Sequence, residues 1–227
     1  MLSDSASPLK AVLFDLDGTL LDTAPDFAIV VNLLLQRHGK PPIEYSLIRA
    51  TVSNGARALV SLAFGINEGD SEFADLRQQL LELYSQHLSV KTKPFDGINE
   101  LLDWLEAQRL SWGIVTNKPR IYTEPIIENL GLSERCATII CPDDVQRTKP
   151  DPEPLYLACK QMQCAAEQTI YIGDHRRDIE AGKNAEMRTI AANYGYINSV
   201  DPAKNWNADF YVDHASELTP LIKSLLS

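Results

Sequence analysis

Short apolar runs recur along the chain and are separated by stretches with helical spacing. Runs of three to five mostly apolar residues are typical of strands that are buried on both faces of a parallel sheet. The runs lie at 11–14, 112–115, 138–141, 169–172, 188–192 and 210–212. Strands that alternate with helices predict an open α/β sheet with helices on both of its faces.

The helices between these strands are predicted from the spacing of leucine and isoleucine. Ile98, Leu101 and Leu105 are spaced to share one face of a helix. Gly131 is a stop signal at the end of another helical pattern. Further helices are predicted at 126–130, 154–162 and 177–185.

The stretch from 24 to 92 breaks this alternation, because nearly all of it shows helical patterns. Thr23 and Asp26 resemble a capping box, with Pro25 in the first turn. We therefore predict a Rossmann-like parallel-sheet core at 1–23 and 93–227 that is interrupted by an all-helical cap domain at 24–92. Helices within the insertion are predicted at 27–36, 45–51, 55–64 and 73–88.

Length and composition agree with this organisation. The chain has 227 residues, more than one ordinary domain needs and fewer than two full domains. A net charge of -10 and a pI near 4.9 give a surface that repels phosphate backbones, so nucleic acid is not an expected partner. No apolar run could span a bilayer, and no signal peptide is expected at the N-terminus. We expect a cytoplasmic protein with no membrane partner, either a monomer or a homodimer.

Two aspartates follow the first predicted strand, one residue apart. Asp15 ends the strand and Asp17 lies just beyond it, so both carboxylates can face the same side, where ligands bind in such sheets. Gly18 allows a tight turn there. Paired carboxylates suit a hard cation such as Mg²⁺, and they also suit a nucleophile with a separate proton carrier. The alternative is a strand end with two solvated aspartates.

The next two predicted strands are followed by different polar groups. Thr116 and Asn117 come after the strand at 112–115 and offer a hydroxyl and an amide for hydrogen bonds. Lys149 comes after the strand at 138–141 and can bring a point charge to the same edge of the sheet. Taken singly, these residues favour turn chemistry and a solvated surface lysine.

The fourth core strand ends at Asp174, and Asp178 follows one helical turn later. This spacing can direct both carboxylates at one cation. The alternative is that Asp174 caps the next helix while Asp178 lies on its exposed face. Because polar groups stand at four strand ends in order, we expect them to meet at one edge of the sheet.

Together, D-x-D-G-T, T-N, K-P and G-D-x-x-x-D resemble the four motifs of the haloacid dehalogenase-like hydrolase superfamily, and the insertion resembles its helical cap. The resemblance implies a Mg²⁺-dependent phosphatase with Asp15 as the nucleophile and Asp17 as the acid and base. It implies that Mg²⁺ is held by Asp15, the Asp17 backbone carbonyl and Asp174, with Asp178 in support. The residues implied to bind the transferring phosphoryl group are Thr116, Lys149 and Asn117.

Other classes of protein match these motifs less well. An acid at Asp17 favours phosphate esters over haloacids, because the dehalogenases of the superfamily lack an acid there. Phosphomutases share these motifs and stay open. A phospho-acceptor signalling domain needs only about half this length and has no helical insertion. A non-catalytic binding protein on the same fold is disfavoured, since every catalytic position is filled.

The motif surroundings resemble the phosphoglycolate phosphatase branch, and within it the bacterial phosphatases of N-acetylmuramic acid 6-phosphate, which recycle cell-wall amino sugars. The stretches that carry this resemblance are GARALV, VTNKP, CPDDV, KPDPEPL, GDHRRDIEAG and YGYI. Both candidate substrates bear a carboxylate beside the phosphate ester. Arg57 in the insertion is therefore expected to bind the substrate carboxylate, with a solvated helix arginine as the alternative. Other sugar phosphates remain open.

Overall fold

The computed structural model describes residues 8–198 and 200–226 of the chain. Residues 1–7, within the stretch where no signal peptide is expected, lie outside the described part, as do residues 199 and 227. Within the described part, none of the helices combines the length and the apolar character that crossing a membrane requires.

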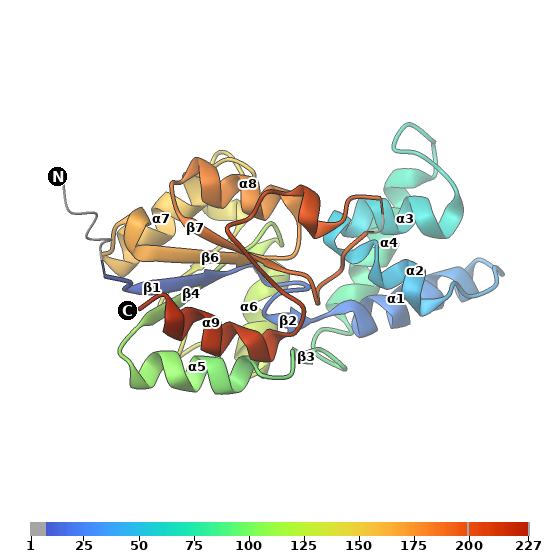
Figure 1. The fold of residues 1–227 in the computed structure, drawn as a ribbon. Helices are drawn as coiled ribbons and strands as arrows, with labels where there is room; N and C mark the ends of the chain where they lie inside the picture. The colour runs from blue at the N-terminus through green and yellow to red at the C-terminus, as the bar shows by residue number, and fades with distance from the viewer. Residues whose placement is uncertain (1–7, 199, 227) are drawn as a thin grey trace.

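A six-stranded parallel sheet lies at the centre of the fold (Figure 1). Its strands are β1 (Ala11–Phe14), β4 (Ser111–Val115), β5 (Ile139–Ile140), β6 (Thr169–Gly173), β7 (Arg188–Ala192) and β8 (Phe210–Val212). They lie in the order β5-β4-β1-β6-β7-β8, so β1 is flanked by β4 and β6. The predicted Rossmann-like α/β fold is confirmed, and each predicted strand end is within one residue of the observed end.

Helices cover both faces of the sheet. The face that carries Val12 and Phe14 packs against one set of helices, and the face that carries Leu13 packs against another. Because neighbouring residues of a strand point to opposite faces, β1 is buried on both sides, which explains its run of apolar residues. The first set is α5 (Ile98–Ala107), α6 (Arg120–Asn129) and α9 (Leu218–Ser224). The second set is α7 (Glu153–Met162) and α8 (Arg176–Asn184).

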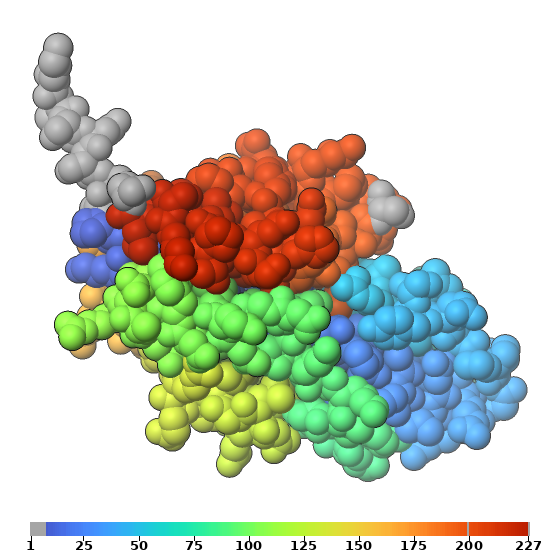
Figure 2. Space-filling model, turned by 60° about the horizontal axis from the view of Figure 1, so that its bottom comes forward, coloured from blue at the N-terminus to red at the C-terminus, as the bar shows by residue number. Residues whose placement is uncertain are grey.

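Four helices lie between β1 and α5, in the segment predicted to be helical. Their apolar side chains form a hydrophobic cluster distinct from the clusters of the sheet. Figure 2 shows this segment, coloured blue to teal, as a lobe beside the α/β core. The division of the chain at residues 24 and 92 stays a prediction. The helices are α1 (Ala24–Arg37), α2 (Tyr45–Arg49), α3 (Gly55–Phe64) and α4 (Phe73–Ser85), with a 3₁₀ turn at Val52–Asn54.

The capping box predicted at the start of α1 is wrong. Thr23 precedes the helix, but its hydroxyl donates to Asp17 Oδ1 at 2.6 Å and does not cap the helix. Pro25 occupies the first turn as predicted. The backbone N–H groups of Thr23 and Ala24 donate to the hydroxyl of Tyr196, at 2.6 and 2.8 Å. The start of α1 is therefore fastened to a loop that is distant in the sequence.

A short stem joins the insertion to the core. Here β2 (Leu21–Asp22) and β3 (Lys93–Pro94) pair in antiparallel fashion. Asp26, which is fully buried in α1, closes the same junction. Its carboxylate accepts hydrogen bonds from the backbone N–H groups of Lys91 and Thr92, at 2.6 and 3.2 Å, and from the Thr92 hydroxyl at 2.6 Å.

Replacing Asp26 by alanine is expected to lower the free energy of unfolding by about 2–4 kcal/mol, because the N–H and hydroxyl of the buried Thr92 and the N–H of Lys91 would lose their acceptor. Chemical denaturation measures this change. Asp96→Ala is the matched control, since the Asp96 side chain is 99% exposed and should change stability by no more than about 0.5 kcal/mol. Equal effects of the two substitutions would contradict the role given to Asp26.

Candidate active site

The carboxyl ends of three central strands bring predicted site residues to one edge of the sheet. Thr116, Asp15 and Asp174 directly follow β4, β1 and β6, which are neighbours. Lys149 reaches this edge from the loop between β5 and α7. The roles given to these residues stay predictions, but their proximity is a property of the fold.

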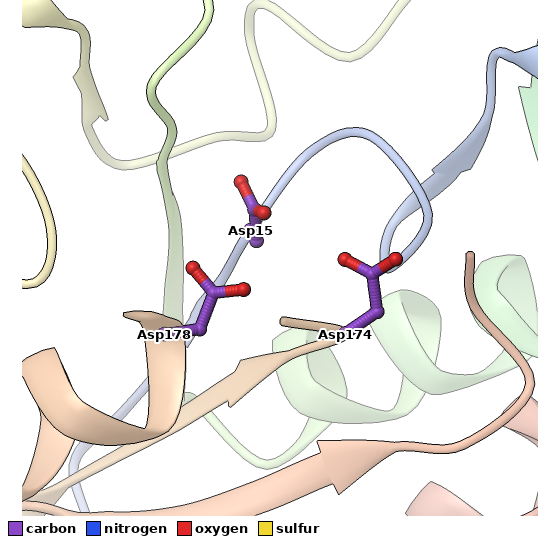
Figure 3. A group of neighbouring side chains, drawn as sticks. All are labelled: Asp15, Asp174 and Asp178. Atoms are coloured by element: carbon purple, nitrogen blue, oxygen red, sulfur yellow. The ribbon is translucent and has the colours of Figure 1, made fainter. Parts of the chain in front are cut away.

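Asp15, Asp174 and Asp178 point toward one another at this edge (Figure 3). All three are buried, and each offers a carboxylate oxygen within 4.8 Å of the others. Burial, followed by repulsion from neighbouring carboxylates, raises the pKa of Asp15 and raises the pKa of Asp174 to about 8. Buried carboxylates this close favour a bound cation, and oxygen ligands suit a hard divalent metal. These three aspartates, which we call the carboxylate group, can therefore hold a divalent metal ion.

Lys149 supplies the positive charge inside this group. Its ammonium lies 3.0 Å from Asp15 Oδ1 and 2.7 Å from Asp178 Oδ1. It also donates to the carbonyl of Val115 at 2.9 Å and to the hydroxyl of Tyr171 at 2.8 Å. The residue is only 3% exposed, so the alternative of a solvated surface lysine is wrong.

The alternative placement of the fourth motif is also wrong. Asp178 is fully buried, and the N-cap of α8 is His175, not Asp174. The Nδ1 atom of His175 accepts from the backbone N–H of Arg177 at 3.2 Å, which assigns the proton of the neutral ring to Nε2. Burial lowers the pKa of His175 to about 4. Its Nε2 faces Oδ1 of Asn54 in the insertion at 3.3 Å.

Glycines let the backbone approach Asp174 closely. Gly18 has a φ of +83°, and a Cβ atom there would lie 2.1 Å from Asp174 Oδ2. A Cβ on Gly195 would lie 2.3 Å from Asp174 Cβ. Neither position can carry a side chain without displacing this carboxylate. The space is used by the backbone N–H of Tyr196, which donates to Asp174 Oδ2 at 2.8 Å.

The carboxylate of Asp17 is bound by a lysine that sequence reasoning missed. The ammonium of Lys118 lies 2.9 and 3.2 Å from the two carboxylate oxygens of Asp17. It also donates to the hydroxyl of Tyr84 in α4 at 2.7 Å and lies over the ring of Phe27 in α1, 5.0 Å from its centroid. Lys118 therefore joins Asp17 to two helices of the insertion. A lysine in a turn carries no sequence signal that separates it from a solvated one.

Thr116 and Asn117 brace the neighbouring loops. The hydroxyl of Thr116 accepts from the backbone N–H of Lys118 at 3.1 Å. The side-chain amide of Asn117 donates to the carbonyl of Lys149 at 3.1 Å. Asn117 thus ties the loop after β4 to the loop that carries the buried lysine.

A cavity of about 500 Å³ lies between this edge of the sheet and the insertion. Arg57, predicted to bind substrate, lies in its wall on α3. Its guanidinium pairs with Glu68 at 2.8 Å, and its side chain is 63% exposed. The site residues that line the cavity from the core are Asp15, Asp17, Thr116, Asn117, Lys118 and Arg177.

The insertion also touches the carboxylate group directly. The hydroxyl of Ser53, in the 3₁₀ turn before α3, donates to Asp174 Oδ2 at 3.1 Å. Arg177 donates from its guanidinium to the carbonyl of Ser53. Sequence reasoning missed both residues, because their contacts join positions far apart in the chain.

Comparisons with known proteins agree with this geometry. The family described as haloacid dehalogenase-like hydrolase matches residues 12–192. The chain is 48% identical to the N-acetylmuramic acid 6-phosphate phosphatase of Pseudomonas aeruginosa, over 96% of each chain. It is 40% identical to a phosphoglycolate phosphatase of Xanthomonas campestris, over 92% of this chain and 94% of the relative. The solved structure of a predicted phosphoglycolate phosphatase from Haemophilus somnus superposes with a TM-score of 0.84 at 26% identity, covering 95% of this chain and 99% of that one.

Without metal, the free energy of unfolding is expected to fall as the pH rises from 6.5 to 8. The folded chain keeps the proton of Asp174 up to a pKa of about 8, whereas the unfolded chain releases it near 3.8. Unfolding therefore releases a proton in this range, and higher pH favours it, by up to about 2 kcal/mol in total. His175 acts in the opposite direction, but only below 6.5.

Thermal unfolding in EDTA and in MgCl₂ at both pH values measures this effect. A divalent cation replaces the proton, so the rise in Tm on adding metal should be larger at pH 8 than at pH 6.5. Asp174→Asn should remove most of the pH dependence and most of the rise. An equal rise at the two pH values would show that Asp174 is not the titrating group.

Proposed function

Because the chain belongs to the haloacid dehalogenase-like hydrolase family and is a phosphoric monoester hydrolase, we propose that its substrate is N-acetylmuramic acid 6-phosphate. The observation that carries this proposal is the 48% identity, over nearly the whole of both chains, to a phosphatase named for that substrate. We further propose that Mg²⁺ is the cofactor and that the reaction proceeds through an aspartyl-phosphate.

Asp15 is the proposed nucleophile. Its carboxylate is oriented by the backbone N–H of Leu16 at 2.7 Å and by the ammonium of Lys149 at 3.0 Å, both on Oδ1. An oxygen of Asp15 attacks phosphorus, and the bond from phosphorus to the ester oxygen breaks with its electron pair leaving on that oxygen. Lys149 and Thr116 stabilise the charge on the transferring phosphoryl group, with Asn117 beside them.

Asp17 is the proposed acid and base. It protonates the departing alcohol oxygen, and as a carboxylate it then takes a proton from the water that attacks the aspartyl-phosphate. The bond from phosphorus to Asp15 breaks in this second step, which restores the free carboxylate and releases phosphate. Lys118 and Thr23 hold the Asp17 side chain in the cavity wall for both steps.

The metal would be held by Asp15 and Asp174, together with the backbone carbonyl of Asp17, and Asp178 would support it. The fit rests on the buried carboxylate group described above, whose oxygens lie within 4.8 Å of one another. When bound, Mg²⁺ supplies positive charge that lowers the repulsion between an anionic nucleophile and an anionic phosphate ester.

Arg57 is retained as a proposed contact to the substrate from the insertion, since it lies in the cavity wall. The second candidate substrate is 2-phosphoglycolate, favoured by the 40% identity to a phosphatase named for it. Both esters are small anions. We propose that the protein acts on them without a nucleic-acid or membrane partner.

Phosphate release in MgCl₂ decides between the two esters. We expect kcat/KM for N-acetylmuramic acid 6-phosphate to exceed that for 2-phosphoglycolate by at least about tenfold. Asp15→Asn should abolish release from both, because an amide is not a nucleophile of comparable strength. A preference for 2-phosphoglycolate would overturn the substrate and leave the hydrolase activity standing. Release by Asp15→Asn at the wild-type rate would overturn the role of Asp15.

Asp17→Asn is expected to lower kcat for the sugar phosphate by roughly 10²–10⁴-fold. An aryl ester such as p-nitrophenyl phosphate has a leaving group that needs no proton. Formation of the aspartyl-phosphate from this ester should therefore remain fast in Asp17→Asn. Rapid mixing should then show a burst of p-nitrophenol close to the enzyme concentration, followed by slow turnover as the aspartyl-phosphate accumulates. A steady rate equal to wild type, with no burst, would contradict both the intermediate and the role of Asp17.

A further inference from the structure

A second arginine of the insertion lines the cavity and has no hydrogen-bond partner for its buried Nε atom among the described residues. Arg77 belongs to α4 and lies in the cavity wall. Its Nε atom is buried, and no acceptor among the described residues reaches it. A guanidinium donor that is removed from water without an acceptor is unfavourable, so this position is suited to an acceptor from outside the described residues.

Arg57 differs from Arg77 in this respect. The guanidinium of Arg57 already pairs with Glu68, within the insertion itself, and its side chain is largely exposed. An anion that bound to Arg57 would have to compete with that carboxylate. Arg77 is the better placed of the two cations, because the described residues leave its buried donor free.

The position of Arg77 along α4 sets its distance from the reacting groups. Arg77, Leu81 and Tyr84 are spaced to share one helix face, and all three lie in the cavity wall. Tyr84 contacts Lys118, which contacts Asp17, so this end of the face adjoins the proposed acid. At a rise of 1.5 Å per residue, the backbone of Arg77 lies roughly 10 Å from that of Tyr84 along the helix axis.

Two observations place the Arg77 guanidinium at the far end of the cavity. Helix side chains lean toward the N-terminus of their helix, which for Arg77 is the direction away from Tyr84. Among the described residues, the cations within ion-pair distance of Asp15, Asp17 and Asp178 are Lys149 and Lys118, and Arg77 is not one of them. One end of the cavity therefore holds the phosphate-transfer groups and the other holds Arg77.

We propose that Arg77 binds the carboxylate of the substrate at a site separated from the phosphate by the width of a sugar ring. This inference rests on the proposed function and sharpens it. In 2-phosphoglycolate a single methylene group separates the ester from the carboxylate, so the molecule cannot reach both ends. In N-acetylmuramic acid 6-phosphate the phosphate is on C6 and the lactyl ether is on C3, so several bonds of the pyranose ring separate the two anions. Phe27, Leu81 and Tyr84 also line the cavity, and their carbon surfaces offer a wall against which such a ring can pack.

The test compares esters with and without the carboxylate. N-acetylglucosamine 6-phosphate lacks only the lactyl ether of N-acetylmuramic acid 6-phosphate. The ratio of kcat/KM for this pair is measured in the wild type, in Arg77→Gln and in Arg57→Gln. Arg37→Ala is the control for the loss of any arginine from the insertion. Arg37 is exposed at the end of α1 and does not line the cavity.

Arg77→Gln is expected to lower kcat/KM for the carboxylate-bearing ester by roughly 10- to 100-fold, as for the loss of a charged hydrogen bond. Its kcat/KM for N-acetylglucosamine 6-phosphate should stay within about threefold of wild type, and Arg37→Ala should match the wild type on both esters. Arg77→Lys should recover part of the loss, because it keeps the charge but not the fork of donors. Equal losses on the two esters, or a loss of preference in Arg57→Gln alone, would overturn the proposal.

A second pair of esters makes the test of Arg77 independent of the proposed substrate. In 4-carboxyphenyl phosphate a carboxylate lies across an aromatic ring from the ester, and phenyl phosphate lacks it. If the wild type hydrolyses neither amino sugar but prefers 4-carboxyphenyl phosphate, and Arg77→Gln loses that preference, then the proposed substrate fails while the role of Arg77 stands. If the wild type shows no preference within either pair, the role of Arg77 fails.

Discussion

The ammonium of Lys149 is the charge on which the site depends. It is buried between the carboxylates of Asp15 and Asp178, and a third buried carboxylate, Asp174, lies beside them. A buried carboxylate that loses its cation is strongly unfavourable, so the lysine stabilises an arrangement that the chain could not otherwise hold. The lysine is held in turn by the end of β4 and by Tyr171 of β6. The register of the central strands thus fixes the electrostatics of the site.

The sheet and the core of the site could be predicted because their signals are local. The apolar run of β1 and the aspartates after it are neighbours in sequence, and strand order brings the other strand ends to the same edge. Lys118, Ser53 and Tyr196 could not be predicted, because each acts through partners far along the chain. The stem strands β2 and β3 are two residues each and leave no pattern. The helix α9 was missed because it is short, with only seven residues and a proline among them. The capping box failed because Thr23 found a stronger partner in Asp17 than in its own helix.

The charge of the whole chain and the charge of its cavity have opposite signs. The net charge is -10, yet the cavity wall carries Arg57, Arg77, Lys118 and Arg177. An acidic exterior discourages large polyanions, while a basic interior attracts a small one. The insertion contributes two of these four cations, and its aromatic side chains Phe27 and Tyr84 line the same space. The core is therefore suited to the phosphate, which is common to all such esters, and the insertion to the remainder of the molecule.

The hydrogen bond from Ser53 to Asp174 couples the insertion to the carboxylate group. Tyr196 strengthens this connection, since its backbone binds Asp174 and its hydroxyl binds the start of α1. Binding equilibria that share an atom are reciprocal, so if the position of the lobe alters the affinity for a cation, the cation must bias the lobe by the same factor. Under that condition, a cation bound by these aspartates and the arrangement of the cavity beneath the insertion would not be independent of each other.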